Sequence, residues 1–91
     1  MNNVEKRREF IKSLDVEQLN TYDKVVVWVM CRNGLKIGKA SEELYYHRNS
    51  VLRRIERIKE KTGLDLRDFY DAVKLLAMIG EDPQLRKAEE N

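Results

Sequence analysis

The chain has 91 residues, of which 42% are apolar and 37% charged, and its net charge is +2. Compact domains usually contain roughly 100–150 residues, so this length predicts one domain whose core is too small to hold a deep catalytic cleft. The single Cys31 excludes a disulfide framework, and with the single His47 it excludes a Cys/His zinc site. We therefore expect neither a metal nor another cofactor.

The hydropathy of the chain predicts a soluble cytoplasmic protein. Its longest apolar run, residues 25–31, is far shorter than the ~20 residues that span a bilayer. No apolar core follows the basic opening of the chain, so we expect no signal peptide and no membrane partner. Cys31 is then expected to be a buried thiol in a reducing compartment.

Positive charge is concentrated in the middle third of the chain. Residues 36–61 carry eight basic and four acidic side chains, whereas residues 62–91 carry four basic and seven acidic ones. A local excess of this kind attracts a polyanion even when the whole protein is nearly neutral.

Apolar periodicity predicts an all-α fold of about five helices, with a first, charged helix over about residues 4–14 and a connector to residue 21. A second helix is expected over about residues 22–32, where Asn33-Gly34 supplies a stop signal. The β-branched run Val25–Val29 is also compatible with a strand by propensity. We favour a helix because no turn and second strand follow to pair with it.

A pair of helices follows, over about residues 37–44 and 48–62, separated by a turn at Tyr45-Tyr46-His47. Small Ala40 permits close approach of the two helices, and Gly63 ends the second one. The residues that recur at helical spacing on its inner face are Val51, Ile55, Ile58 and Thr62, with Leu44 facing them from the first helix.

A last helix is expected over about residues 69–79, with Asp68 as N-cap and Asp71 three residues later. Its Leu75–Ile79 run is apolar on nearly every side of the helix. This pattern predicts that two sides of the helix are buried, one of them available for contact with another subunit. The resulting organisation is an N-terminal helix and connector over residues 1–21, a core domain over 22–80 and a polar tail over 81–91.

The spacing of the central pair is typical of a helix-turn-helix, whose second helix enters the major groove of DNA. Arg48, Asn49 and Ser50 stand at the start of that helix, where side chains reach base edges. Arg53, Arg54 and Arg57 follow about one turn later and suit the flanking phosphates. Alternatively, these arginines only form the solvent-exposed face of a surface helix and bind no DNA.

The turn residues allow two interpretations. His47 is either a helix N-cap or a phosphate contact, with the cap favoured. Tyr45 and Tyr46 can touch the DNA backbone through their hydroxyls, although at least one of them is expected to pack under the turn. We include Tyr46 and His47 among the candidate DNA-binding residues.

The motifs His47-Arg48-Asn49-Ser50, Glu56-Arg57-Ile58 and Thr62-Gly63-Leu64-Asp65-Leu66 resemble the C-terminal DNA-binding domain of PucR/CdaR-type bacterial regulators. The resemblance covers roughly Tyr22 to Gly80. It implies a helix-turn-helix of the kind also seen in the factor for inversion stimulation, acting as a homodimer on double-stranded DNA.

The chain departs from that family at two residues and in its architecture. Leu52 stands where the family usually has a basic residue, and Ser50 stands where it has threonine. Family regulators also carry the motif at the end of a much longer chain with a sensory part. Sensing would then belong to a separate protein, unless the chain is a fragment or a stand-alone remnant.

No glycine-rich phosphate loop, activated nucleophile or cluster of metal ligands is present, so we do not expect an enzyme. The sequence predicts a transcriptional regulator that binds double-stranded DNA. The alternative is a protein–protein adaptor that keeps the fold without effective DNA binding, which Leu52 and the acidic last third favour.

Overall fold

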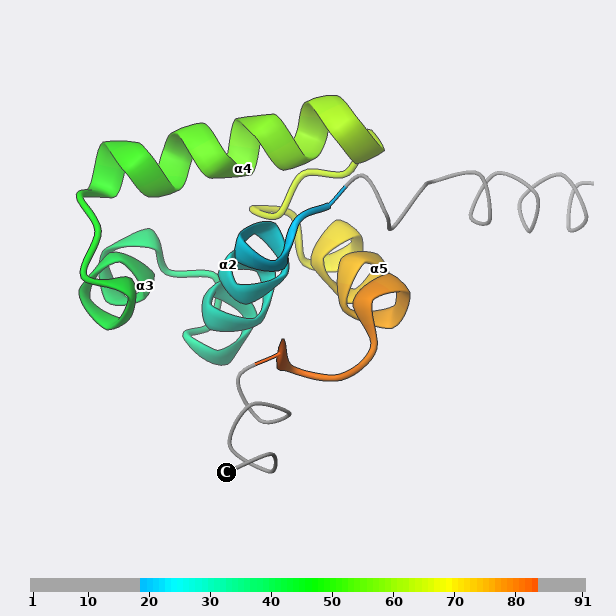
Figure 1. The fold of residues 1–91 in the computed structure, drawn as a ribbon, viewed down its shortest axis with the longest axis horizontal. Helices are drawn as coiled ribbons and strands as arrows, with labels where there is room; N and C mark the ends of the chain where they lie inside the picture. The colour runs from blue at the N-terminus through cyan, green and yellow to red at the C-terminus, as the bar shows by residue number, and fades with distance from the viewer. Residues whose placement is uncertain (1–18, 84–91) are drawn as a thin grey trace, which may run out of the picture.

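The computed structural model describes residues 19–83, which form four α-helices and no strand (Figure 1). The helices are α2 (Thr21–Arg32), α3 (Ile37–Leu44), α4 (Arg48–Thr62) and α5 (Phe69–Ile79). The all-α prediction is therefore confirmed. The helix expected over residues 4–14 and the tail from residue 84 onward lie outside the described residues.

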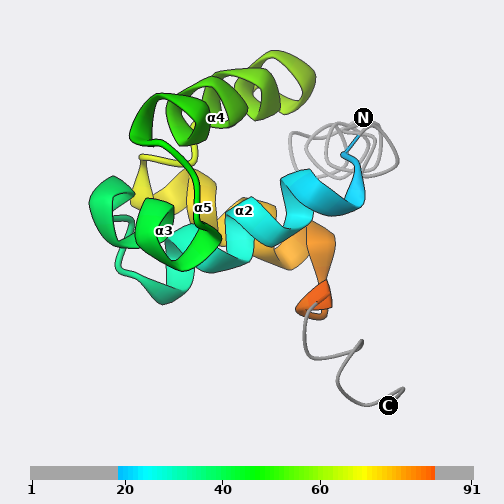
Figure 2. The same cartoon turned by 60° about the vertical axis from the view of Figure 1, so that its left-hand side comes forward.

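Helix α2 is the centre of the domain, because it packs against each of the other three helices. Val26, Val27, Val29 and Met30 expose no surface. This run has a high strand propensity by composition. Strand propensity depends strongly on context, so burial of the helix against three neighbours outweighs it. Figures 1 and 2 show α4 lying across one side of the molecule, over α2.

The start of α2 is fixed by a capping box. The side chain of Asn20 accepts a hydrogen bond from the Asp23 N–H at 2.8 Å, and the Asn20 N–H donates to the Asp23 carboxylate at 3.2 Å. Such a pair satisfies two of the otherwise unpaired backbone donors at a helix start. The cap holds Asp23 in one orientation, which matters for the site below.

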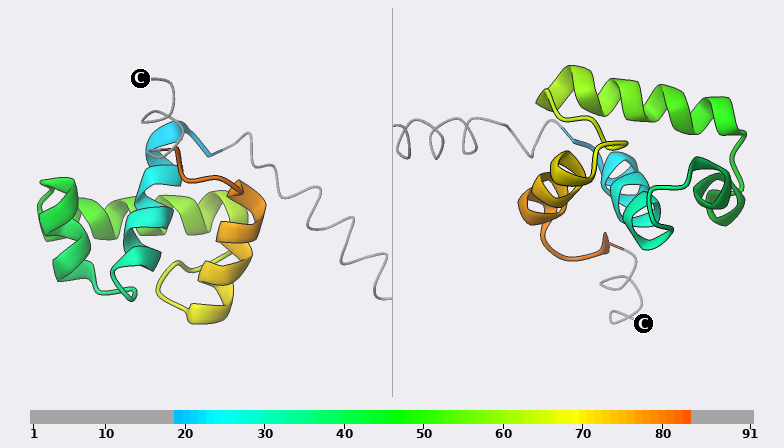
Figure 3. Two further views of the ribbon diagram at one scale, coloured as in Figure 1. Left: turned by 90° about the horizontal axis from the view of Figure 1, so that it is seen from below. Right: turned by 180° about the vertical axis from the view of Figure 1, so that it is seen from behind.

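Helices α3 and α4 form the predicted helix-turn-helix. Ala40, Val51 and Ile55 are completely buried between the helices and α2, and Leu44 packs against the same core. Two further views show α3 and α4 joined by a short turn at one end of α4 (Figure 3). The small Ala40 side chain and the apolar contacts thus serve the roles expected of them.

Two left-handed residues end these helices. Tyr45 closes α3 with φ 55° and ψ 39°, and the Tyr46 N–H bonds the Ser41 carbonyl at 3.0 Å. Gly63 closes α4 with φ 76°, and its N–H bonds the Lys59 carbonyl at 2.7 Å. Glycine adopts this conformation freely, whereas tyrosine does so at a cost.

Helix α5 uses most of its apolar run inside its own domain. Leu75 is completely buried, Leu76, Met78 and Ile79 pack against the core, and Ala77 is exposed. The Leu75–Ile79 run therefore offers less surface to a second subunit than the sequence suggested. The large apolar side chains that α5 does expose are at its start, namely Phe69, Tyr70 and Val73.

Arg32 of α2 anchors the segment that follows α5. Its guanidinium bonds the carboxylate of Asp82 at 2.7 Å and also the carboxylate of Glu43 on α3. Asp82 is buried, although the sequence placed it in a polar tail. Among the described residues, no helix combines the length and apolarity needed to cross a membrane.

Candidate nucleic-acid interface

The outer face of α4 presents polar and basic side chains to solvent. Burial of Val51, Ile55 and Ile58 fixes which side of the helix faces the core. Arg48, Asn49, Arg53 and Arg57 are all exposed, and their side chains make no hydrogen bond or ion pair within residues 19–83. These four predicted site residues are thus open to a partner.

Arg54 lies in a different environment from the neighbouring Arg53. Its guanidinium bonds the Oδ1 atom of Asp23 at 3.2 Å, and the Lys61 ammonium lies 3.1 Å from the Oδ2 atom. Asp23 is completely buried, whereas the Arg54 and Lys61 side chains are 23% and 22% exposed. Arg54 therefore holds α4 against the start of α2, and its predicted phosphate contact stays a prediction.

The turn and α4 together line an open hollow of about 310 Å³. The residues around it are Tyr46, Ser50, Arg53, Arg54 and Arg57. Five of the predicted site residues are thus brought together, while Arg48 and Asn49 lie nearer the start of α4. Three guanidinium groups and two hydroxyls around one hollow suit an anionic oxygen.

The side chain of Tyr22 joins this site, although no motif in the sequence pointed to it. Its ring stacks on that of Tyr46, with centroids 5.2 Å apart and an interplanar angle of 25°. The Arg54 guanidinium carbon lies 4.7 Å from the centroid of the Tyr22 ring. Burial raises the pKa of the Tyr22 phenol, so it stays neutral in the physiological range.

His47 caps α4, as the favoured interpretation predicted. Its side-chain Nδ1 atom accepts a hydrogen bond from the Asn49 N–H at 3.1 Å. Because Nδ1 is the acceptor, the neutral ring carries its proton on Nε2. The ring is exposed, so that proton remains available to a partner at the start of the helix.

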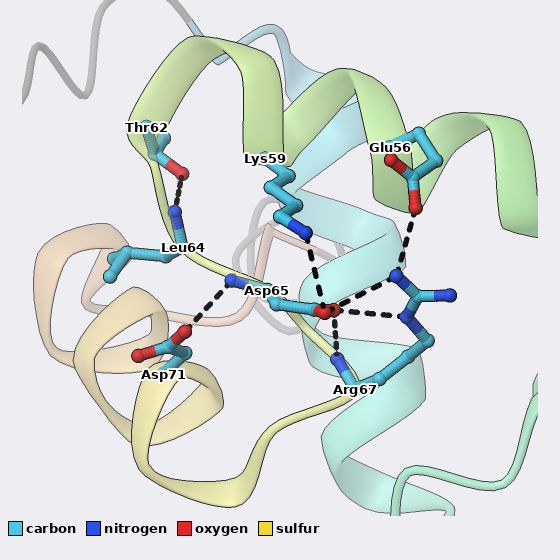
Figure 4. A network of polar contacts seen from close by, with 7 residues as sticks. All are labelled: Glu56, Lys59, Thr62, Leu64, Asp65, Arg67 and Asp71. Carbon is cyan, nitrogen blue, oxygen red and sulfur yellow. Dashed lines mark hydrogen bonds and ion pairs between the residues drawn. The ribbon is translucent and has the colours of Figure 1, made fainter.

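The loop that follows α4 forms ion pairs with Glu56 and Lys59 of this helix (Figure 4). Arg67 bonds Glu56 at 2.8 Å and Asp65 at 3.0 Å, and Lys59 lies 4.0 Å from Asp65. The bonds from Arg67 hold the pKa of Asp65 below its usual value. The negative charge of Glu56 is thereby balanced, and the exposed arginines without a described partner, Arg48, Arg53 and Arg57, lie within the first ten residues of the helix.

Hydrogen bonds between side chains and backbone groups also hold this loop in place. The Thr62 hydroxyl donates to the Ile58 carbonyl at 2.8 Å and accepts from the Leu64 N–H at 3.1 Å. The Asp65 N–H donates to the Asp71 carboxylate at 3.0 Å, which joins the loop to α5. Within the described part of the chain, no His, Cys, Asp and Glu side chains gather in a group that could hold a metal ion.

Comparison with known families gives a match to a helix-turn-helix domain. Residues 26–79 match the model of the PucR C-terminal helix-turn-helix domain. No curated protein and no solved structure matches the chain. The matched residues include most of α2 and all of α3, α4 and α5, with the turn and the basic face of α4 between them. Domains of this kind imply DNA binding in transcriptional regulation and are typically not enzymes. The chain belongs to the family of PucR C-terminal helix-turn-helix domains.

Proposed function

We propose that the protein is a transcriptional regulator that binds double-stranded DNA in a sequence-specific way, with α4 in the major groove. The observation that carries the proposal is that Asn49, Arg53 and Arg57, on the exposed face of α4, have no side-chain partner within residues 19–83. Recognition helices of this motif present such side chains to bases and phosphates. A DNA-binding role places the protein at the nucleoid of the cytoplasm.

Sequence readout is assigned to the first turn of α4. Arginine bonds guanine bidentately and asparagine does the same with adenine, so Arg48 and Asn49 suit base edges in the major groove. Ser50 is half-buried at the hollow and serves either a base or a phosphate. Recognition helices contact bases mainly through their N-terminal residues, which is where these three stand.

Phosphate contacts are assigned to the hollow and the turn. Arg53 and Arg57 supply charge, and the Tyr46 hydroxyl and the His47 Nε2–H supply neutral donors. Arg54 adds positive potential while it remains bonded to Asp23. These contacts fix the orientation of the helix on DNA and carry no sequence information themselves.

Leu52 is half-buried on α4 and stands where the family usually has a basic residue. Leu52→Arg is expected to tighten binding if this side of α4 meets phosphates. It should not tighten binding if Leu52 instead contacts a thymine methyl or an adjoining helix, because the substitution then removes an apolar contact.

The deciding experiment is a fluorescence anisotropy titration of duplex DNA at several salt concentrations. Arg53→Ala and Arg57→Ala should weaken binding on all sequences alike and lower the salt slope by about one for each phosphate that a subunit no longer neutralises. Arg48→Ala and Asn49→Ala should cost roughly 1–3 kcal/mol on the preferred site only. Lys74→Ala, which removes an exposed cation on α5, is the matched control and should change neither quantity.

We further propose that the regulator acts as a homodimer, because one short recognition helix reads only a few base pairs. Two copies place their recognition helices about 34 Å apart, one turn of DNA. The exposed side chains of Phe69, Tyr70 and Val73 are the described apolar surface that α5 offers to a second copy.

A protein–protein adaptor is the second candidate function. The exposed aromatic pair Phe69 and Tyr70, whose ring centroids are 5.8 Å apart, favours it, since aromatic side chains are enriched at protein interfaces. A folded protein that binds no duplex in a salt-dependent manner would support the adaptor and contradict the DNA-binding proposal.

A further inference from the structure

Tyr22 contacts the candidate DNA surface from a position just before the residues that match the family model. The family match begins at residue 26, whereas Tyr22 stands in the first turn of α2. Its ring nevertheless stacks on Tyr46, which lines the hollow with Arg53 and Arg57. The family resemblance assigns no role to this residue.

The Tyr22 ring also contacts Arg54, a second residue of the hollow. The Arg54 guanidinium lies over the ring at 4.7 Å and is itself bonded to the buried carboxylate of Asp23. Asp23 is held in turn by the capping box with Asn20. Arginine over an aromatic ring is an attractive arrangement, so this set of contacts forms a rigid base for Tyr46.

Tyr46 needs such a base because it lies at the edge of the domain. Its residue surface is 38% exposed, and the preceding Tyr45 is 96% exposed. A tyrosine without a stacking partner would lose rotamer freedom on binding, and that loss weakens affinity. Stacked on Tyr22, the ring is already ordered before DNA arrives.

We propose that Tyr22 is a positioning residue of the DNA surface: it holds Tyr46 so that the Tyr46 hydroxyl and the guanidinium groups of Arg53 and Arg57 receive one backbone phosphate in the hollow. The inference rests on the proposed DNA-binding function. It assigns the hollow to a phosphodiester group, which hydroxyl and guanidinium donors around an open surface suit.

The test compares two substitutions of Tyr22 by anisotropy on the preferred duplex and on an unrelated duplex. Tyr22→Leu removes the stack on Tyr46 and the contact with Arg54, and should weaken binding about 5–10-fold on both duplexes. Tyr22→Phe keeps the ring and removes only the buried hydroxyl. It should restore binding to within about 2-fold of the unaltered protein.

The salt slope separates positioning from general damage to the surface. The phosphate donor that Tyr22→Leu displaces is the neutral hydroxyl of Tyr46, so the slope for this variant should equal that of the unaltered protein. A shift of the basic side chains would instead lower the slope. Lys74→Leu, which introduces the same side chain at an exposed position of α5 outside the apolar stripe, is the control and should bind as the unaltered protein does.

A double-mutant comparison shows whether Tyr22 acts through Tyr46. In a Tyr46→Leu background, Tyr22→Leu should weaken binding no further, because its target is already gone. Should Tyr22→Leu fail to fold by circular dichroism, Tyr46→Leu and Tyr46→Phe carry the test from the exposed side of the stack. Both variants should then bind equally weakly, because each lacks the Tyr46 hydroxyl that receives the phosphate.

The outcomes distinguish this inference from the proposed function. Equal binding by the unaltered protein and a folded Tyr22→Leu variant overturns the positioning role alone. Full additivity of the two substitutions, or binding by Tyr46→Phe equal to that of the unaltered protein, also overturns it. Absence of salt-dependent DNA binding by the unaltered protein overturns the proposed function and the positioning role together.

Discussion

The guanidinium of Arg54 lies 3.2 Å from the carboxylate of Asp23, a side chain with no exposed surface at the start of α2. Lys61 reaches the other carboxylate oxygen at 3.1 Å, and the same carboxylate completes the capping box of α2. One buried acid thus joins the central helix to two turns of α4. This link fixes the orientation of the recognition helix α4 relative to α2.

Removing Asp23 is expected to destabilise the whole domain. Asp23→Ala leaves two partly buried cations without their partner and breaks the capping box, which together should lower the free energy of unfolding by about 2–4 kcal/mol. Glu60→Ala, at an exposed acid on the same helix as the two cations, should stay within about 0.5 kcal/mol. Urea denaturation of the two variants makes the comparison. Equal costs would show that the buried link adds nothing.

Helix boundaries were the part of the fold that sequence predicted best. Each described helix begins and ends within about a residue of its expected bounds, because local signals such as Asn33-Gly34, Gly63 and Asp68 act where they stand. The interior of the helix pair was also predictable, since Ala40 and Val51 fall on the expected face.

Contacts between distant residues were not predictable. Asp23 is separated by 31 residues from Arg54 and by 38 from Lys61, and no local rule pairs them. The signal available was an acidic residue in the first turn of a helix rich in apolar residues. The stack of Tyr22 on Tyr46 had no comparable signal, and the uniform apolarity of Leu75–Ile79 did not show which side of α5 faces the core.

The two left-handed residues give a paired prediction about backbone strain. At Gly63, φ is 76° and a β-carbon would meet no atom within 4 Å, so Gly63→Ala should destabilise through the backbone alone, by about 1–2 kcal/mol. Tyr45 has φ 55° and its side chain is almost fully exposed. Tyr45→Gly relieves the strain and adds freedom to the unfolded chain, for a net stabilisation of about 0–1 kcal/mol. Thermal melts of both variants test this, and a destabilised Tyr45→Gly would contradict it.

The interaction between Asp65 and Arg67 predicts a pH dependence. Hydrogen bonds from Arg67 lower the pKa of Asp65 from its ordinary 3.8, so the interaction stabilises the fold above that value, and this stabilisation disappears as the pH falls through the lower, folded value. The stability difference between the unaltered protein and Asp65→Asn should therefore be constant above about pH 5 and shrink below about pH 4. Urea denaturation over a pH series measures it. A difference that stays constant down to the most acidic pH would refute the assignment.

The dimer prediction concerns the exposed face of α5. Phe69, Val73 and Ala77 recur every four residues on that face, and Phe69 and Val73 are 66% and 47% exposed. If this stripe meets a second copy, Val73→Glu places a charge inside an apolar contact and should convert the dimer to a monomer in sedimentation. Lys74→Glu is the control. It introduces a glutamate at the next residue, which lies outside the stripe, and should leave the dimer intact.

The dimer also makes a geometric demand on DNA. Two recognition helices about 34 Å apart should prefer half-sites whose centres are about 10–10.5 base pairs apart. A duplex with that spacing should bind the unaltered protein more tightly than one in which the spacing is changed by half a turn, because only the first lets both helices enter the groove from the same side. The Val73→Glu monomer should bind the two duplexes equally. A protein that sediments as a monomer at high concentration, both free and on DNA, would rule out the homodimer.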